Sequence, residues 1–402
     1  MASAFETWAS LNQDVLGRIF RSLPTLTDRV YASAVCKHWR FVAVQTENQP
    51  AELPWLLMPS TGRTFHFRVF GGSTHQENSE HVPVGARFCG SFPGGWFVVQ
   101  LHAPRGRYAL LNVPSGNQIA LPDNMEAPVR SNSGIQHSNL YPVLAIHAAV
   151  LSAAPTPDGA YIVAALTSGK TNVAFWRPGM AHWSPPLHTE VGRRASWADE
   201  MIPTATEDGF MEDVVHYRRG DFECFYVLTS TEFVYNYEPV ITEDGALTMR
   251  RTCTAPTARM FRGVGGAGAG SIARYLVVSG KDLLIVRRFA SLPVAPNVIR
   301  LHVVRLQDRQ GARYTLNCWD MPPGQLLFLG RGCSRAYTTG VYTKPGGYIY
   351  FLNAEKFPGS TTIGYHCSDT GRCDYRRLEL EIQRVLPRGP ASNCSPWIWF
   401  FH

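Results

Sequence analysis

Paired runs of β-type residues recur along most of this chain, and they limit its fold more than any other sequence feature. Each pair begins with a short apolar or aromatic run, and a second such run follows after a connection. The five pairs are 95–100 with 108–113, 160–166 with 171–176, 225–229 with 231–237, 274–279 with 282–289, and 325–329 with 348–352. Three of the connections contain Gly or Ser beside charged residues, which is typical of hairpin turns.

The pairs follow one another at the spacing of a structural repeat. Their leading residues are separated by 65, 64, 51 and 51 positions, and they are Trp96, Tyr161, Phe225, Leu276 and Leu327. Repeated sheets of about 40–50 residues per unit are typical of a β-propeller. Residues 53–402 have room for about seven such units, or six if the longer spacings contain insertions. A β-sandwich, or two separate β-domains, is the alternative that this pattern leaves open.

The two ends of the β-region are unusually apolar. The segment PWLLM at 54–58 opens the region, and SPWIWFF at 395–401 ends the chain. Such segments would be exposed hydrophobic patches unless they are buried. In a propeller they would lie side by side and complete the ring. The alternative is that each segment packs separately.

The first 48 residues have the period of helices. Asn12 or Gln13 can cap a helix whose apolar positions recur at spacings of one, three and four residues, and Pro24 ends it. Those apolar positions are Val15, Leu16, Ile19, Phe20 and Leu23. A unit of this size cannot bury all of its apolar surface alone, so it requires a partner, either the next domain or another protein.

Residues 8–40 resemble an F-box closely. The pattern is W-x-x-L from Trp8, spaced aliphatic residues, Leu23, Asp28, and then V-C-x-x-W-R from Val35 to Arg40. Asn12 departs from the family, because many F-boxes have Pro there, and we expect a looser start of the first helix and modestly weaker binding. The resemblance implies docking on the Skp-type adaptor of an SCF-type cullin ubiquitin ligase. By the match, the adaptor-binding residues are Leu11, Leu16, Ile19, Leu23, Val35, Trp39 and Arg40.

Three further stretches extend the resemblance beyond the F-box. They are PWLLMP at 54–59, LLNVPSGNQIALP at 110–122 and SPWIWFF at 395–401. They resemble a large family of plant F-box proteins whose KIB-type members carry a β-propeller. The predicted fold class is therefore an α+β multidomain protein, with a small all-α F-box at 1–48 and an all-β propeller-like domain of six or seven blades at 53–402. The implied function is substrate recognition for ubiquitination, with an unidentified protein as the substrate.

Composition argues against several other partners. The net charge is +7 and the pI is about 9.0, but the basic residues are scattered as singles and pairs, so we expect no nucleic-acid partner. The N-terminus has no apolar signal core, and the longest apolar stretch, 142–154, is too short to cross a bilayer. We therefore expect no membrane partner and a cytoplasmic or nuclear location. Nine Cys without a CxxC motif predict neither zinc nor a disulfide framework.

No motif in the chain predicts catalysis or a cofactor. The Gly-rich segment 263–270 contains a formal GxGxxG, but a strand-like run follows it where a dinucleotide site needs a helix. His216 with Asp213 or Asp221 could suggest acid–base chemistry, yet no nucleophile motif accompanies them. Two other functions stay open. The propeller could recognise a glycan or small ligand, or the protein could regulate a partner without ubiquitination.

Overall fold

The fold is taken from a computed structural model of the chain. The residues that the structure describes are 8–23, 26–45, 53–60, 63–68, 74–75, 81–102, 107–130, 136–142, 145–168, 173–186, 211–219, 222–230, 232–243, 247–254, 271–289, 298–309, 313–318, 325–338, 347–352, 371–375, 380–383 and 395–401. The Gly-rich segment 263–270 and Asp221 lie outside these residues.

The N-terminal part is helical, as predicted. Its helices are α2 (Gln13–Ser22), α3 (Leu26–Ser33) and α4 (Lys37–Ala43). Asn12 is the N-cap of α2, and its side-chain oxygen accepts a hydrogen bond of 2.7 Å from the backbone N–H of Asp14. Asn12 thus holds the start of the helix in place, because the cap satisfies a donor that lacks a partner inside the helix. The looser start expected from Asn12 is therefore wrong for the free chain, and weaker binding stays a prediction.

The rest of the described chain forms β-sheets. Six sheets have three to five strands each among the described residues, and one has two. In chain order the strands are β1 (Trp55–Ser60), β2 (Arg63–Arg68), β3 (Thr74–His75), β4 (Arg87–Phe92), β5 (Trp96–Gln100), β6 (Tyr108–Asn112), β7 (Gln118–Ala120), β8 (Asn124–Arg130), β9 (Gln136–Pro142), β10 (Ala145–Leu151), β11 (Val163–Ser168), β12 (Val173–Trp176), β13 (Met211–Arg219), β14 (Phe222–Thr229), β15 (Val234–Ile241), β16 (Leu247–Thr254), β17 (Ser271–Ser279), β18 (Asp282–Phe289), β19 (Val298–Arg309), β20 (Arg313–Cys318), β21 (Gln325–Leu329), β22 (Arg335–Thr338), β23 (Tyr348–Phe351), β24 (Gly371–Asp374), β25 (Leu380–Glu381) and β26 (Ile398–Phe400).

Four of the five predicted pairs of runs are antiparallel neighbours: β5 with β6, β11 with β12, β14 with β15, and β17 with β18. The fifth pair differs, because β21 and β23 run parallel. Strand β22 accounts for the difference. The chain turns back after β21, and β22 pairs antiparallel with the other edge of β21. The hairpin neighbour of β21 is therefore β22, and β23 is reached by a longer connection.

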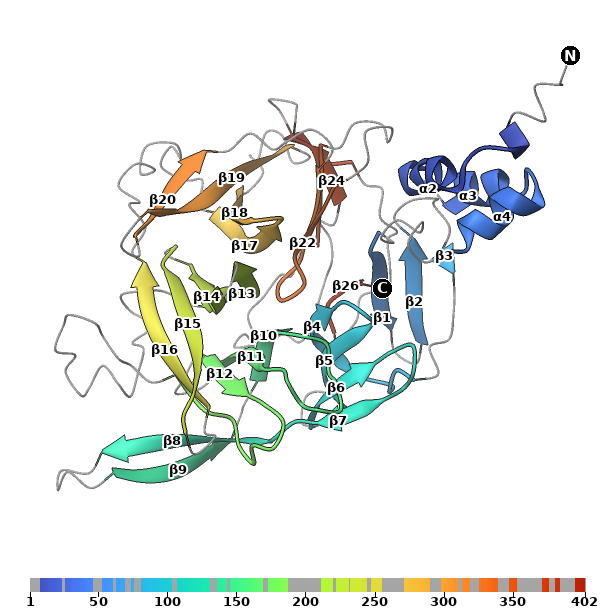
Figure 1. Ribbon diagram of the computed structural model, residues 1–402. Helices are drawn as coiled ribbons and strands as arrows, with labels where there is room; N and C mark the ends of the chain where they lie inside the picture. Colours follow the sequence, from blue (N-terminus) through green and yellow to red (C-terminus); the bar gives the residue numbers. More distant parts are fainter. Residues whose placement is uncertain are drawn as a thin grey trace, which may run out of the picture.

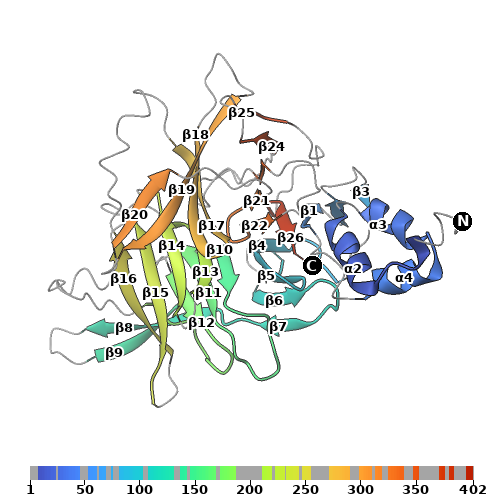
Figure 2. The same ribbon diagram turned by 45° about the horizontal axis from the view of Figure 1, so that its top comes forward.

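The six larger sheets surround a common centre, which Figure 1 shows. The strands nearest the centre contact one another in the order β26, β4, β10, β13, β17 and β22. The helical part lies outside this ring beside β1, β2 and β3, and the β8–β9 hairpin extends away on the opposite side (Figures 1 and 2). This arrangement is propeller-like, as predicted. The number of blades, six or seven, stays a prediction.

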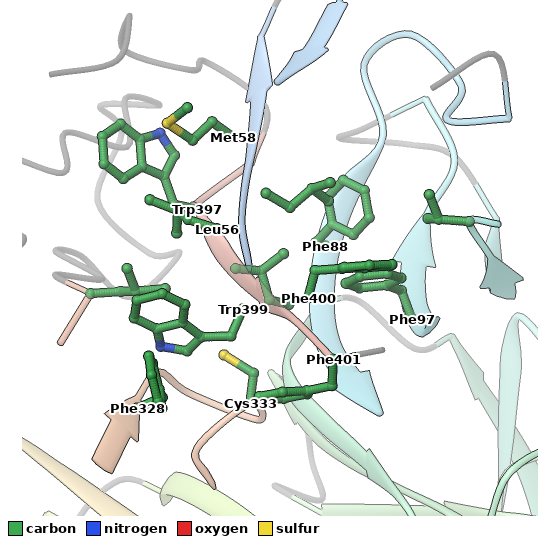
Figure 3. Close-up of a cluster of buried hydrophobic side chains, with 14 of the residues drawn as sticks. Leu56, Met58, Phe88, Phe97, Phe328, Cys333, Trp397, Trp399, Phe400 and Phe401 are labelled. Atoms are coloured by element: carbon green, nitrogen blue, oxygen red, sulfur yellow. The ribbon is translucent and has the colours of Figure 1, made fainter. Parts of the chain in front are cut away.

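The two apolar ends of the β-region lie side by side. Strand β26 pairs antiparallel with β1, and Trp55 is opposite Phe400. The alternating side chains of β26 face different sheets (Figure 3). Trp399 packs edge-on against Phe328 of β21, whereas Phe400 stacks on Phe97 of β5 with ring centroids 5.7 Å apart. The last strand thus joins three sheets, as expected if the chain ends complete a ring.

Candidate functional site

The three helices have a small core of their own. Leu16 and Phe20 of α2 pack on Trp39 and Val42 of α4, and all four side chains are buried. The indole N–H of Trp39 donates to the backbone oxygen of Trp8 at 3.0 Å, which ties the N-terminal segment to α4. We call residues 8–45 the helical unit.

The predicted adaptor-binding residues fall into three groups by burial. Leu16 and Trp39 are buried inside the helical unit. Leu11, Ile19 and Leu23 are half-buried and pack against the same core. Val35 and Arg40 are exposed. In the free chain, Leu16 and Trp39 therefore support the fold of the unit, and Val35 and Arg40 are the predicted residues most accessible to a partner.

The helical unit exposes several large apolar side chains, among them Val15 of the predicted apolar stripe. Among the described residues nine large hydrophobic side chains are exposed, and six of them belong to the helical unit. They are Trp8, Val15, Tyr31, Val35, Phe41 and Val44, and we call them the exposed apolar set. Several exposed apolar side chains in one small unit are typical of an interaction surface.

Helix α4 has two distinct faces. Trp39 and Val42 point into the core, whereas Phe41 and Val44 are three residues apart on the outer face, next to exposed Lys37 and Arg40. The sequence pattern did not single out Phe41 and Val44, because they lie outside the apolar stripe that contains Trp39. Their position along the helix could have revealed them. An apolar residue that lies outside the core-facing stripe of a short helix is expected at the surface.

A second group of functional candidates lies at the ring centre, where residues 330–334 connect β21 to β22. The N–H of Gly332 donates to Asp213 Oδ1 of β13 at 2.9 Å, and its carbonyl accepts from Ser91 of β4 at 3.2 Å. A Cβ at Gly332 would lie 2.9 Å from the backbone nitrogen of Ala149 of β10. We call residues 330–334 the axial loop, because it contacts three inner strands at once.

Asp213 is the fully buried partner of the axial loop. Its carboxylate accepts hydrogen bonds from three backbone N–H groups, those of Val214, Leu276 and Gly332. Burial raises the pKa of Asp213 to about 7, although the three N–H groups and the charge of Arg331 lower it. Asp213 therefore holds β13, β17 and the axial loop together. It does not bond to His216, whose ring nitrogen lies 2.8 Å from Glu223 Oε1.

The inner strands share an irregularity of register near this loop. One extra residue interrupts the pairing with the next strand in β4, β10, β13 and β17, at Cys89, His147, Glu212 and Ile272 respectively. Such β-bulges redirect side chains and are frequent beside functional sites. Two of these extra residues, His147 and Glu212, are titratable groups. The bulges were not visible in the sequence, because each depends on pairing with another strand.

Charged side chains cluster at the same end of the inner strands. Arg274 of β17 bonds to Glu212 at 3.3 Å and to Glu232 at 3.2 Å, and Arg287 of β18 bonds to Glu232 as well. Arg274 and Arg287 are directly opposite on neighbouring strands. Glu232, which has a positive φ of 71° before β15, offsets the repulsion between these two like charges.

The charges of two further arginines act on His147 of β10. Burial, and then the charges of Arg87 and Arg331, lower the pKa of His147 to about 4. His147 is therefore neutral at physiological pH. Arg331, in the axial loop, also acts on Glu212 and Asp213. Arg87, His147 and Arg331 are each half-buried, and one side-chain nitrogen of each is buried.

Other classes of site are not evident within the described segments. In that part of the chain no group of three His, Cys, Asp or Glu side chains could hold a metal ion. None of the helices described is long and apolar enough to span a bilayer.

Small sheets arranged around one centre, with the first and last strands of the β-region paired, are typical of a β-propeller protein. The chain belongs to the KIB1-4 beta-propeller family, whose sequence profile matches residues 64–372. No curated protein sequence matches the chain. A solved structure titled "Bacteroides ovatus Xyloglucan PUL GH43B" is similar at a TM-score of 0.28 and 10% identity, over 79% of this chain and 56% of that one. The chain thus spans just over half of that structure, and a likeness of this size bears on neither site nor function.

Proposed function

We propose that this protein is the substrate-recognition subunit of an SCF-type cullin ubiquitin ligase. The helical unit docks on a Skp-type adaptor, and the propeller binds a protein substrate for ubiquitination. The observation that carries the proposal is the exposed apolar set on a unit whose sequence resembles an F-box from Trp8 to Arg40. In this function the chain carries no catalytic step of its own.

The burial of each side chain indicates whether it stabilises the helical unit or contacts the adaptor. A side chain that is already buried in the free chain offers little new apolar area to a partner, so Leu16 and Trp39 contribute mainly by keeping the helices folded. Val35, Phe41 and Val44 can still lose exposed apolar surface on binding. Arg40 and Lys37 beside them add polar contacts at the rim, where charged residues govern association rate and specificity.

Adaptor binding tests the proposal. Isothermal titration of the full chain with a Skp-type adaptor should show saturable binding, and the double variant Val35→Asp/Phe41→Asp should weaken it at least about tenfold, as the loss of apolar anchors at an interface centre does. The matched control is Val84→Asp/Ile241→Asp, which changes two equally exposed apolar residues outside the helical unit. Unaltered affinity in the first variant, or an equal loss in the control, would count against this docking surface.

The core of the unit provides a second control. Leu16→Ala should destabilise the helical unit by about 2–5 kcal/mol, as is usual for a buried leucine. Its loss of adaptor binding should therefore be accompanied by loss of helical circular dichroism. The surface variants should keep that signal. Adaptor binding without any polyubiquitinated client in a reconstituted ligase would instead favour a regulator that acts without ubiquitination.

A further inference from the structure

The β8–β9 hairpin is anchored at its base and projects from the ring. Met125 of β8 and Trp183 are buried in the same hydrophobic core. The N–H of Trp183 donates to the backbone oxygen of Asn124 at 2.9 Å, and the N–H of Glu126 donates to the backbone oxygen of Trp183 at 2.8 Å. Beyond these bonds the hairpin extends away from the ring, on the side opposite the helical unit (Figures 1 and 2).

The strand register shows which backbone groups of β9 face outward. The backbone groups of Asn124 and Glu126 that bond to Trp183 point away from β9, and every second residue of β8 shares this direction. In an antiparallel pair, residues directly opposite each other both face inward or both face outward. The outward-facing residues of β9 are therefore those opposite Glu126, Pro128 and Arg130. They are Leu140, Ser138 and Gln136 respectively.

The two outer edges of the hairpin differ in what they can bind. On β8, Trp183 occupies the start of the edge, and Pro128 further along has no N–H to donate. On β9, proline stands only at the last residue, Pro142. Among the described residues no strand pairs with β9 on its outer side. The backbone from Gln136 to Leu140 therefore presents a row of N–H donors and C=O acceptors, which we call the β9 edge.

The outer strands of the other described sheets are short, paired or charged. Strands β3 and β7 have only two and three residues. An isolated bridge places Ser184 on β12 and Gln383 on β24. Strand β16 contains Arg250 and Arg251, and β20 begins with Arg313, and charged residues on an edge discourage the addition of a strand. Strand β9 contains no Asp, Glu, Lys or Arg, so it lacks this protection.

We propose that the β9 edge binds an extended segment of the substrate protein, which adds to the hairpin as a third strand. This inference rests on the proposed function, which makes the partner a substrate. An extended backbone matches the alternating donors and acceptors of the edge. Leu140 is exposed there and favours an apolar or β-branched residue beside it. The helical unit lies on the opposite side of the ring, so adaptor and substrate do not compete.

A second copy of this chain would be a different occupant of the same edge. Two β9 edges could pair antiparallel across a two-fold axis. Stable interfaces between folded proteins bury at least about 1,200 Å². A single short edge does not supply that area, whereas an extended peptide binds a sheet edge mainly through main-chain hydrogen bonds. We therefore assign the edge to a substrate segment, and sedimentation should show the free chain as a monomer.

Backbone methylation of a peptide tests for an added strand. The probe is a short linear peptide selected on the full chain from a displayed library without proline, and its titration should be saturable. N-methylation of one alternate set of its residues should weaken binding at least about tenfold, because only every second residue bonds to the edge. N-methylation of the other set should leave the affinity unchanged. Absence of saturable binding, or a sensitivity that does not alternate, would overturn the proposal.

Substitutions in β9 locate the site. Ser138→Pro removes one outward donor and should weaken binding of the selected peptide at least about tenfold. Pro128 lies directly opposite Ser138, so the hairpin already contains proline at the equivalent position of its other edge. Leu140→Asp should weaken binding at least about twofold. The matched control is Ile241→Asp, a comparably exposed apolar residue of β15, which should bind like the unmodified chain. Equal affinity in Ser138→Pro, with thermal melting showing it folded, would contradict the site.

The adaptor separates failure of this site from failure of the proposed function. Ser138→Pro should bind the adaptor like the unmodified chain. In a reconstituted ligase, a reporter protein that carries the selected peptide should be polyubiquitinated with the unmodified chain and much less with Ser138→Pro. Alternating peptide binding without adaptor binding would keep the β9 edge as a docking site and count against the ligase role. Adaptor binding without peptide binding, or dimerisation that Ser138→Pro abolishes, would overturn the assignment of the edge to a substrate.

Discussion

Asp213 is a buried carboxylate with several backbone hydrogen bonds and a raised pKa. Its carboxylate is fully buried, and three backbone N–H groups from three segments of the chain converge on it. Removal of the carboxylate from water costs more than these contacts recover, so its pKa rises to about 7. The Asp213 carboxylate thus lowers the stability of the folded chain at neutral pH, but it connects two inner strands to the axial loop.

The pH dependence of folding should show this cost. The pKa of Asp213 is higher in the folded chain, about 7, than in an unfolded chain, about 4. Between these values the folded state binds more protons, so its contribution to stability is complete below about pH 4 and is lost as the pH rises through 7. The free energy of unfolding of the unmodified chain, measured in urea, should fall relative to that of Asp213→Asn by more than about 1 kcal/mol from pH 5 to pH 8.

Asp213→Asn should itself be destabilising by about 1–3 kcal/mol at pH 5, because one amide NH₂ group would face backbone donors. A parallel pH dependence of the unmodified chain and of the variant would contradict the raised pKa. Asp123→Asn, an exposed carboxylate beside Arg107, is the matched control and should leave the dependence unchanged.

At the scale of elements, the axial loop changes the strand order of its sheet. It brings β22 to the inner edge of its sheet, so that β21 pairs with β22 on one side and with β23 in parallel on the other. Gly332 makes this approach feasible. Its φ of +63° favours glycine, and its backbone passes directly against Ala149 and Cys89.

Substitution of two glycines with similar φ angles distinguishes the cost of backbone strain from the cost of crowding by neighbouring atoms. Gly280, in the β17–β18 turn, has a φ of +59° and open space around it, whereas Gly332 is crowded by backbone atoms. Gly280→Ala should cost about 1–2 kcal/mol, the usual penalty for a left-handed residue. Gly332→Ala should cost about 1–3 kcal/mol more, because inserted atoms would overpack the centre. Equal losses in urea unfolding would contradict the close approach of the axial loop.

For the whole molecule, the pairing of β1 with β26 decides whether the sheets behave as one unit. Trp399 is fully buried in β26, and its indole N–H donates to the backbone oxygen of Leu329 at 3.0 Å. Phe400 contacts the sheet on the other side. The last few residues of the chain therefore connect sheets formed by its beginning, by β4–β7 and by β21–β24 (Figure 3).

Loss of the contacts made by β26 should lower the free energy of unfolding of the whole ring of sheets. Trp399→Ala should destabilise the protein by about 3–5 kcal/mol, as for other buried aromatic residues. Trp399→Phe keeps a ring in place but loses the bond to Leu329, and should cost less, with about 1 kcal/mol from the hydrogen bond. Both variants should unfold in transitions that coincide in fluorescence and circular dichroism. If β26 packs independently, its loss should leave the main transition unchanged.

Much of the architecture was predictable because it depends on local patterns. The helices of residues 8–45, the cap at Asn12 and four of the antiparallel pairs follow from periodicity, capping and turn residues. The parallel β21–β23 pair was not predictable, because β22 lies between these two strands in the chain and takes the hairpin position beside β21. The exposed side of α4 was missed for a similar reason, because the sequence shows a stripe but not what covers the opposite face.

By itself, the sequence predicted the change from helices to strands, favoured the propeller class and showed that both apolar chain ends need burial. Side-chain period and turn residues act over only a few positions, so they can be read from the sequence. Only the tertiary structure decided that Leu16 and Trp39 are core while Phe41 and Val44 are surface, and that Asp213 joins β13, β17 and the axial loop. These outcomes depend on register shifts between strands and on contacts between residues hundreds of positions apart, and no local pattern encodes them.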